Sequence, residues 1–388
     1  MKFLAAALLL TATLSAAAVP TRTLPLEEQW RVGGADADLL IGTVARAAAD
    51  AAGNVYLLDS QLCHVLVIAP DGTLLRTISG DGDGPGETRQ PRDIVILPDG
   101  GVGLMTMFPA KLVRLTPEGE PLPSLEFRLA EGEHADFVAG NLCRARGGNL
   151  VLGATHLVQT ETGQERAFLL GRWSADGAPG PRYRTSHMTL DFSRVHFVER
   201  ENSPAFHRAV ALGPDGRVYC AEEWNDYAVG VYAPDGTRER TVTRPFENRD
   251  RTALELQRVN DLYDASARNS PVKQTREVEP QPPVIAALHV DAESNLWVEH
   301  SRSGEGLPDG VMLAFDVFPP DGSPHERVLM ACEGDAAEDG LLLLPDGRWL
   351  LLKGLAAAET AQSDLGNIPL SEGGDTSAME FVCYRPRE

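Results

Sequence analysis

Short apolar segments alternate with glycine-bearing turns along most of the chain. Six of these segments each follow a turn of similar chemistry; Val55-Tyr-Leu-Leu58, for example, follows Asp50-Ala-Ala-Gly-Asn54. Sequences such as Asp-Gly and Pro-Asp-Gly favour tight hairpins because glycine accepts the positive φ that these turns require. The pattern therefore predicts β-strands joined by short turns. The other five strands of this set are expected at 102–105, 150–152, 218–220, 296–298 and 349–352.

A second set of turns gives the chain a repeat. These second turns lie at 70–72, 117–119, 175–177, 234–236 and 320–322. The equivalent first-turn glycines Gly53 and Gly100 are about 47 residues apart, close to the length of a four-stranded propeller blade. The predicted fold class is therefore all-β, a six-bladed β-propeller of four-stranded blades. The sixth unit has no evident second turn, so the N-terminal segment 23–32 is expected to supply its outer strand and close the last blade.

Three stretches of this pattern are specific enough to suggest a family. They are Gly80-Asp-Gly-Asp-Gly-Pro-Gly-Glu87 followed by Pro91, the run from Asp50 to Asp59, and the run from Val67 to Arg76. They resemble NHL-type six-bladed β-propeller repeats and, more closely, exported bacterial six-bladed propeller proteins of unassigned function. The resemblance is sharpest over 44–128 and 206–245. It implies the fold but says little about activity, because propellers host binding modules, lactonases and lyases alike.

The N-terminus has the features of a secretory signal peptide. Lys2 precedes an apolar stretch from Phe3 to Leu14, and three alanines at 16–18 suit a signal peptidase. We expect cleavage near Ala18, which leaves a single propeller domain over 19–388 in the periplasm or outside the cell. The alternative is an uncleaved anchor, which the alanine-rich end disfavours. No stretch reaches the ~20 apolar residues of a membrane span, so none is predicted.

Charge limits the classes of partner. The chain of 388 residues carries 35 Lys and Arg against 56 Asp and Glu, a formal charge of −21. Non-specific nucleic-acid binding needs a cationic surface, and so does docking on anionic lipid. We therefore expect a protein, peptide or small-molecule partner and no nucleic acid.

The five cysteines show no zinc-type spacing. An exported chain with this number can form up to two disulfides, but buried unpaired thiols are at least as compatible with a core of this size. The sequence does not decide the pairing of Cys63, Cys143, Cys220, Cys332 and Cys383.

The loops that are longer than a minimal blade requires all belong to one class. Both turns of each blade are short, whereas the second-to-third loops and the crossovers between blades are expanded, and these share one face of a propeller. The expansions lie at 160–165, 182–206, 246–283, 299–310 and 354–378. Loops on a rigid scaffold usually form its functional surface, so we expect this face, which we call the insertion face, to carry the function. The alternative is that these loops tolerate added length without having a function.

One expansion contains a helix signal. Thr252-Ala-Leu-Glu255 matches a capping box, and Leu256, Val259 and Tyr263 follow at helical spacing. We predict a helix over about 252–267, within a short helical insertion (about 246–280) between blades 4 and 5. It would pack across the mouth of the channel or simply cover apolar blade ends.

Alignment of the innermost strands on their turn glycines predicts the channel lining. Residues six positions before the turn should pack between blades, namely Ala47, Ile94, Leu142, Val210, Leu288 and Leu341. The positions on either side of them should face the channel, because side chains alternate along a strand. Small residues dominate there, so polar ones are the candidates for ligand contact, with Arg46 and Asp93 expected to pair. The candidates are Arg46, Asp93, Asn141 and His289, with His207, Arg208 and Asp339 near the mouth.

The chemistry of this lining favours binding over metal-dependent catalysis. Calcium takes six to eight oxygen ligands, and the alignment offers only Asp93, Asn141 and possibly Asp339. A zinc lyase would need a histidine cluster, and only His289 aligns. The favoured function is a binding or scaffold protein with its ligand on the insertion face near the channel, without a cofactor. The alternative is a calcium-dependent hydrolase, lactonase or lyase of the propeller class, and a structural envelope component is a third class.

Overall fold

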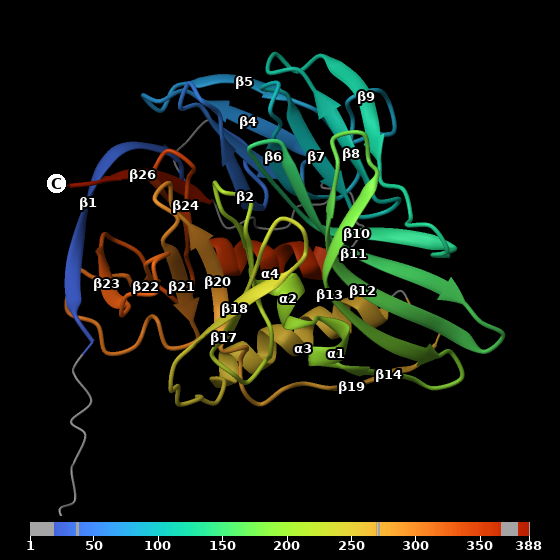
Figure 1. Cartoon of the computed structure of the whole chain (residues 1–388). Helices are drawn as coiled ribbons and strands as arrows, with labels where there is room; N and C mark the ends of the chain where they lie inside the picture. The colour runs from blue at the N-terminus through green and yellow to red at the C-terminus, as the bar shows by residue number, and fades with distance from the viewer. Residues whose placement is uncertain (1–18, 36–38, 269, 271, 366–378, 388) are drawn as a thin grey trace, which may run out of the picture.

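The computed structural model describes residues 19–35, 39–268, 270, 272–365 and 379–387; the predicted signal peptide lies outside them. β-Strands are the main regular structure of this chain, and they form a propeller-like arrangement of four-stranded sheets (Figure 1). The first sheet contains β2 (Val44–Ala49), β3 (Val55–Asp59), β4 (His64–Ile68) and β5 (Leu74–Ile78). The second contains β6 (Pro91–Ile96), β7 (Val102–Thr106), β8 (Lys111–Leu115) and β9 (Pro121–Glu126).

The third and fourth sheets repeat this order of strands. The third contains β10 (Phe137–Arg146), β11 (Asn149–Gln159), β12 (Gly163–Trp173) and β13 (Pro179–Asp191). The fourth contains β15 (Val210–Leu212), β16 (Val218–Ala221), β17 (Ala228–Tyr232) and β18 (Arg238–Thr243). Strands β14 (Val195–Val198) and β19 (Gln274–Glu277) pair separately, in parallel.

An eight-stranded sheet joins the two ends of the chain. Its order is β20-β21-β22-β23-β1-β26-β25-β24. Strand β1 (Thr21–Gly33) pairs in parallel with β23 through its first residues and antiparallel with the last strand, β26, through the rest. The pairing with β26 is the one expected for segment 23–32, whereas the parallel pairing was not predicted. The other strands are β20 (Ile285–Val290), β21 (Leu296–His300), β22 (Leu313–Phe318), β23 (Glu326–Ala331), β24 (Gly340–Leu343), β25 (Trp349–Lys353) and β26 (Glu380–Pro386).

The predicted turn chemistry is visible in the backbone. Gly53 has a φ of 84°, and Ser294, at the equivalent position before β21, has a φ of 68°. This left-handed conformation is strained for most residues with a Cβ and is the usual reason for glycine in such turns. The hairpin signal therefore located the strands correctly.

Hydrophobic clusters fill the spaces between neighbouring groups of strands. Leu58 of β3 and Leu104 of β7 belong to one such cluster, and Trp297 of β21 and Trp349 of β25 belong to another. A further cluster joins Leu350 and Phe381 of the last strands to Val55 of the first sheet. Each sheet therefore buries its faces against its neighbours, as in repeat architectures.

Helices collect on the side of the expanded loops (Figure 1). The short helices α1 (Glu199–Asn202) and α2 (Ala205–Arg208) precede β15. The predicted helix is present as α3 (Ala253–Arg268), and its capping box forms: Glu255 N–H donates to Thr252 Oγ1 at 3.2 Å, and Thr252 N–H donates to Glu255 Oε2 at 2.7 Å.

A second long helix was not predicted. It is α4 (Leu355–Leu365), which begins just after β25 and packs against α3 and β2. Thr43 Oγ1 donates to the Ala358 carbonyl at 3.2 Å, and Ala358 is buried. Helix α4 thus packs directly on the first sheet, whereas no residue of α3 is buried. Within the described residues, no helix has the length and apolar character needed to cross a membrane.

Candidate functional site

A central cavity of about 700 Å³ lies between the inner strands β2, β6, β10, β15, β20 and β24. Small apolar side chains form much of its wall, including Ala48, Ala209, Ala211 and Ala287. The lining continues from the start of the inner strands to their first turns, where Pro98 and Pro345 lie. The cavity therefore extends to the face of the short turns, which the sequence did not single out.

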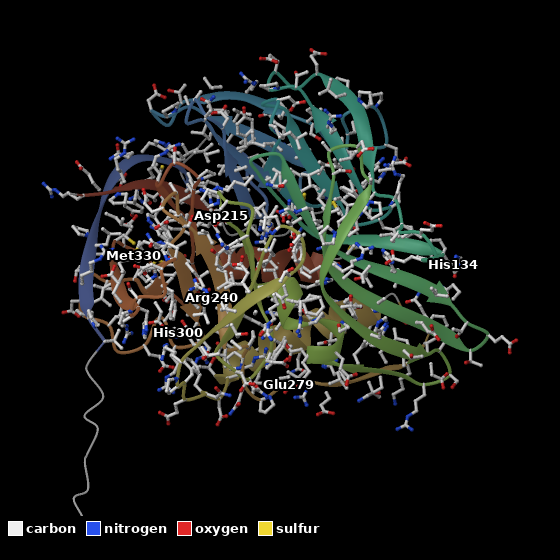
Figure 2. All side chains as sticks on the ribbon, viewed as in Figure 1. His134, Asp215, Arg240, Glu279, His300 and Met330 are labelled. Carbon is white, nitrogen blue, oxygen red and sulfur yellow. The ribbon has the colours of Figure 1, made fainter. Side chains whose placement is uncertain are left out.

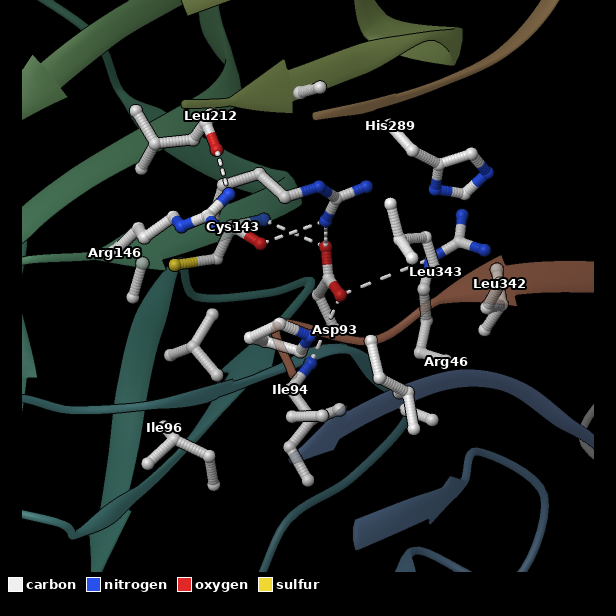
Figure 3. Close-up of a pocket in the computed structure, with 18 of the residues that line it drawn as sticks. Arg46, Asp93, Ile94, Ile96, Cys143, Arg146, Leu212, His289, Leu342 and Leu343 are labelled. Carbon is white, nitrogen blue, oxygen red and sulfur yellow. Dashed lines mark hydrogen bonds and ion pairs between the residues drawn. The ribbon is translucent and has the colours of Figure 1, made fainter. Parts of the chain in front are cut away.

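Asp93 is the buried anion of this cavity, with a side chain that is 3 % exposed. Its Oδ2 accepts a hydrogen bond from the Cys143 backbone N–H at 3.0 Å and is contacted by Arg144 Nη1. Its Oδ1 lies 3.9 Å from Arg46 Nε, so the expected pair of Arg46 and Asp93 is present (Figure 3). The closer partner, Arg144, was not predicted.

Arg144 was missed because the alignment is off by one residue in β10. Ala145 pairs with Leu150 across the first turn of the third sheet, and four residues lie between them. In the first sheet the equivalent pair is Ala49 and Val55, and five residues lie between them. A shift of one residue moves every side chain of a strand to the opposite face. Cys143, rather than Leu142, is therefore the equivalent of Ala47 and packs with the second sheet, whereas Leu142 packs between the third and fourth sheets.

Four arginines line the cavity. The register of β10 brings Arg144 and Arg146 there, and the other two are Arg46 of β2 and Arg208 of α2. Arg146 donates to the Val290 carbonyl at 2.9 Å, and burial lowers its pKa. Arg208 stacks over Trp224 with 5.4 Å between its guanidinium carbon and the ring centroid. Burial lowers the pKa of Arg208 as well, because the surrounding protein desolvates its charge.

His289 lines the same cavity as a neutral imidazole. Burial, with a smaller effect from the charge of Arg144, lowers its pKa to about 4. Its ring lies edge-on to Phe315 and Trp349, with centroids 5.8 and 5.7 Å away. Its Nε2 is buried and has no hydrogen-bond partner among the described residues.

Asn141 and His207 lie together but do not line the cavity. Asn141 Nδ2 donates to Thr155 Oγ1 at 2.8 Å and lies 3.3 Å from His207 Nδ1. His207 Nε2 lies 2.9 Å from the Leu169 carbonyl, so it donates the proton and Nδ1 accepts from Asn141. Burial lowers the pKa of His207 to about 4. The alignment placed Asn141 in the channel because of the same one-residue error in β10.

The proposed calcium ligands do not assemble. Asp339 accepts hydrogen bonds from the backbone of Gly354 and Asp335 at 2.8 and 2.9 Å, so it organises a local loop. The carboxylate of Asp93 already accepts from Arg144 and a backbone amide, and Asn141 belongs to the network of His207. Across the part of the chain that the structure describes, no group of three or more His, Cys, Asp or Glu residues can hold a metal ion. The residues present therefore do not fit the calcium site of the alternative hypothesis.

All five cysteines are described, and all are free thiols. Four are buried and Cys332 is half-buried. Burial raises the pKa of each thiol, as for Cys383, whose pKa is about 11. These thiols are packing residues rather than nucleophiles or disulfide partners.

The expanded crossovers pack against each other. Arg251 from the second crossover forms two contacts of 2.7 and 2.8 Å with the carboxylate of Glu199 from the first, and both side chains are almost fully buried. The Glu279 backbone N–H also donates to Glu199 at 2.9 Å. The two crossovers therefore form one packed layer on the insertion face, and a buried ion pair links them.

The chain is similar in structure to several solved propeller-type proteins. A putative exported protein from Bacteroides fragilis covers 95% of this chain and 100% of its own at 11% identity, with a TM-score of 0.47. A gluconolactonase from Xanthomonas campestris covers 89% and 86% at 12% identity, with a TM-score of 0.45. A streptogramin B lyase covers 93% and 97% at 9% identity, with a TM-score of 0.43. These values are too low to support an argument about activity. No family model and no curated protein matches the chain.

Proposed function

We propose that this protein is an exported, six-bladed propeller that binds a small anionic ligand in its central cavity. Two groups of four strands within the eight-stranded sheet, β20–β23 and β24–β26 with β1, would be the fifth and sixth blades. The cluster that joins Leu350 and Phe381 to Val55 supports closure of the ring between the last and first blades. The NHL-type turn pattern supports the same blade count, and the signal-peptide pattern at 1–18 supports export.

The charge of the cavity is the observation on which the proposal depends. Its lining contains four arginines and two aspartates, Asp50 and Asp93, in a chain whose formal charge is −21. His289 adds no charge at neutral pH because its pKa is about 4. A cleft lined by one sign of charge with apolar walls concentrates ligands of the opposite sign. A cationic cavity in an acidic protein therefore favours a small anion.

Two of the four arginines are available for a ligand. Arg144 is held by Asp93, and Arg146 is held by backbone carbonyls. Arg46 donates only to its neighbouring carbonyl at 2.9 Å and keeps a long contact with Asp93, and its side chain is 45 % exposed. Arg208 donates to Ser203 Oγ at 3.3 Å and stacks on Trp224. The charges of Glu199 and Glu359 act on it without a close ion pair among the described residues. Carboxylate and phosphate groups accept the paired N–H donors that guanidinium presents.

The proposal is binding rather than catalysis. The buried carboxylate of Asp93 is neutralised by guanidinium groups, and His289 is a desolvated imidazole between aromatic rings. Neither group has the arrangement expected of a general base. The ligand site therefore lies in the central cavity, and the insertion face is its structural cover.

A thermal-shift screen tests this proposal. Purified chain 19–388 would be melted with phosphate, acetate, succinate or citrate, and with chloride at matched ionic strength. Succinate should raise the Tm relative to chloride, and Arg46→Gln and Arg208→Gln should each reduce that increase. Arg89→Gln, which removes an arginine from an exposed ion pair with Asp83, is the matched control. Equal Tm values in all five salts would refute the proposal.

A further inference from the structure

A second cavity lies on the third sheet, away from the central one. Strands β10 to β13 contain 10, 11, 11 and 13 residues, whereas the strands of the first two sheets contain five or six. The longer strands extend outward beside His134 (Figure 2). A cavity of about 310 Å³ lies on this extension.

The register of the third sheet places the lining residues on one face. His156 of β11 is opposite Ala167 of β12, which is opposite His187 of β13. Directly opposite residues of antiparallel strands project from the same side of a sheet. Val158 and Leu169 continue this row and complete an apolar floor with Ala167. The walls are formed by Glu133, His134, Glu165, Arg182 and Thr185, and Arg166 borders the cavity from the other face of β12.

His156 is a buried polar group that lacks a protein partner. Its exposed fraction is 6 %, its ring lines the cavity, and no described residue hydrogen-bonds to it. Burial is the main cause of its lowered pKa, so it is neutral near pH 7 and carries one N–H donor and one nitrogen acceptor. His207, in contrast, has partners at both ring nitrogens. Because the unpaired ring nitrogens of His156 are not fully enclosed by protein, they open to the cavity, and a molecule bound there would supply the hydrogen bonds that a polar group with so little exposure normally makes.

The charged groups around this cavity give no excess of positive charge. Arg182 Nη2 contacts Glu133 Oε2 at 2.8 Å. Arg166 alternates with Glu165 and Ala167 along β12, so its side chain projects from the opposite face, where Gln164 and Asn202 hold it at 2.8 and 3.2 Å. The neutral pair of Arg182 and Glu133 and one further carboxylate, Glu165, remain at the cavity. Unlike the central cavity, this site therefore has no excess of arginine to attract an anion.

We propose that this second cavity binds a neutral polyhydroxy compound of monosaccharide size. A hydroxyl group both donates and accepts, so it can satisfy either nitrogen of a neutral imidazole, whereas a carboxylate can only accept and an ammonium can only donate. The glutamate and arginine side chains supply further acceptors and donors, and the apolar floor suits the C–H face of a sugar ring. The volume lies at the lower end of the range for small-molecule sites.

Isothermal titration calorimetry with D-glucose, D-galactose, D-mannose and D-xylose tests this inference. At least one of the four should bind chain 19–388 with a Kd of about 1 mM or tighter. His156→Ala should weaken that binding about tenfold or more, because the ligand hydroxyl loses its partner. Ala167→Leu fills the floor but keeps every polar group, so it should abolish binding even if the histidine variant folds poorly.

Two controls separate this site from other effects. His325→Ala removes an imidazole that stacks on Phe318 in another sheet and should leave sugar binding unchanged. Arg46→Gln alters the central cavity and should also leave it unchanged, so failure of the anion proposal and failure of this one are distinguishable. Absence of binding by all four sugars, or equal affinity in the Ala167→Leu variant, would mean that water alone satisfies His156 and would overturn the inference.

Discussion

Arg144 and Asp93 come from neighbouring sheets, and the guanidinium of Arg144 contacts the carboxylate of Asp93 at the wall of the central cavity. The Cys143 backbone N–H donates to the same oxygen at 3.0 Å. The Asp93 side chain thus links β10 to β6, and its negative charge offsets part of the positive charge of the cavity.

Asp93→Asn should destabilise the fold. The substitution leaves the Arg144 guanidinium without its counter-ion in a partly buried position, and breaking a fully buried pair costs about 3–5 kcal/mol. Because the Arg144 side chain is 29 % exposed, we expect roughly 2 kcal/mol, measured by urea unfolding. Asp83→Asn, in an exposed pair, should cost less than about 1 kcal/mol.

The double variant Asp93→Asn with Arg144→Met provides a check on this interpretation. Removal of both charges should recover a large part of the lost stability, since no uncompensated guanidinium remains. Additive losses in the double variant would show that the two residues act independently.

His207 should make the protein acid-sensitive. Its pKa is near 6.5 in the unfolded chain and about 4 in the folded one, so the unfolded state binds more protons between these values. The free energy of unfolding should therefore fall as the pH drops from 6.5 towards 4. His207→Gln, which keeps a donor and an acceptor, should reduce this slope in urea unfolding measured at several pH values. An unchanged slope would contradict the assignment.

Glu299 should have the opposite pH dependence. The pairing of β20 and β21 places it opposite Ala287, which lines the cavity, and burial raises its pKa to about 7. The folded state therefore holds this proton more tightly, so stability is lost as the pH rises from 4.5 through 7. Glu299→Gln should stabilise the fold at pH 8 by roughly 2 kcal/mol and have little effect at pH 4.5. Equal effects at the two pH values would show that folding does not raise the pKa of this carboxyl.

The ion pair of Arg251 and Glu199 should hold the insertion face together. Glu199→Gln leaves a fully buried guanidinium and should cost about 3–5 kcal/mol in urea unfolding. The matched variant Glu326→Gln, whose partner Arg22 is exposed, should cost under about 1 kcal/mol. A small effect at Glu199 would mean that the crossovers are held mainly by apolar contacts.

Features that depend on a few neighbouring residues were predicted from the sequence more completely than contacts between distant segments. The turn chemistry located the strands because the positive φ at positions such as Gly53 and Ser294 depends on a few neighbouring residues. The capping box located α3 for the same reason. The parallel pairing of β1 with β23 depends on residues some 300 positions apart, so no local pattern reveals it.

Two errors had signals that were available in the sequence. Gly147 and Gly148 are adjacent, which is typical of a two-residue hairpin loop, and that shorter turn sets the register that brings Arg144 into the cavity. Three consecutive alanines at 356–358 favour a helix, a signal that the assignment of 354–378 to an expanded loop does not use. Arg46 and Asp93 precede correctly aligned turns, and they lie together as expected. Asn141 precedes the misaligned turn, and it does not line the cavity.

The most direct test of the central claim is calorimetric titration of chain 19–388 with succinate and with its neutral analogue succinamide. The two compounds have similar shapes and differ in charge, so the comparison isolates the role of the cavity arginines. We expect succinate to bind, succinamide not to bind, and Arg208→Gln to weaken succinate about tenfold or more. Equal behaviour of the two compounds, or an unchanged affinity in the Arg208 variant, would contradict the proposal that the central cavity is an anion site.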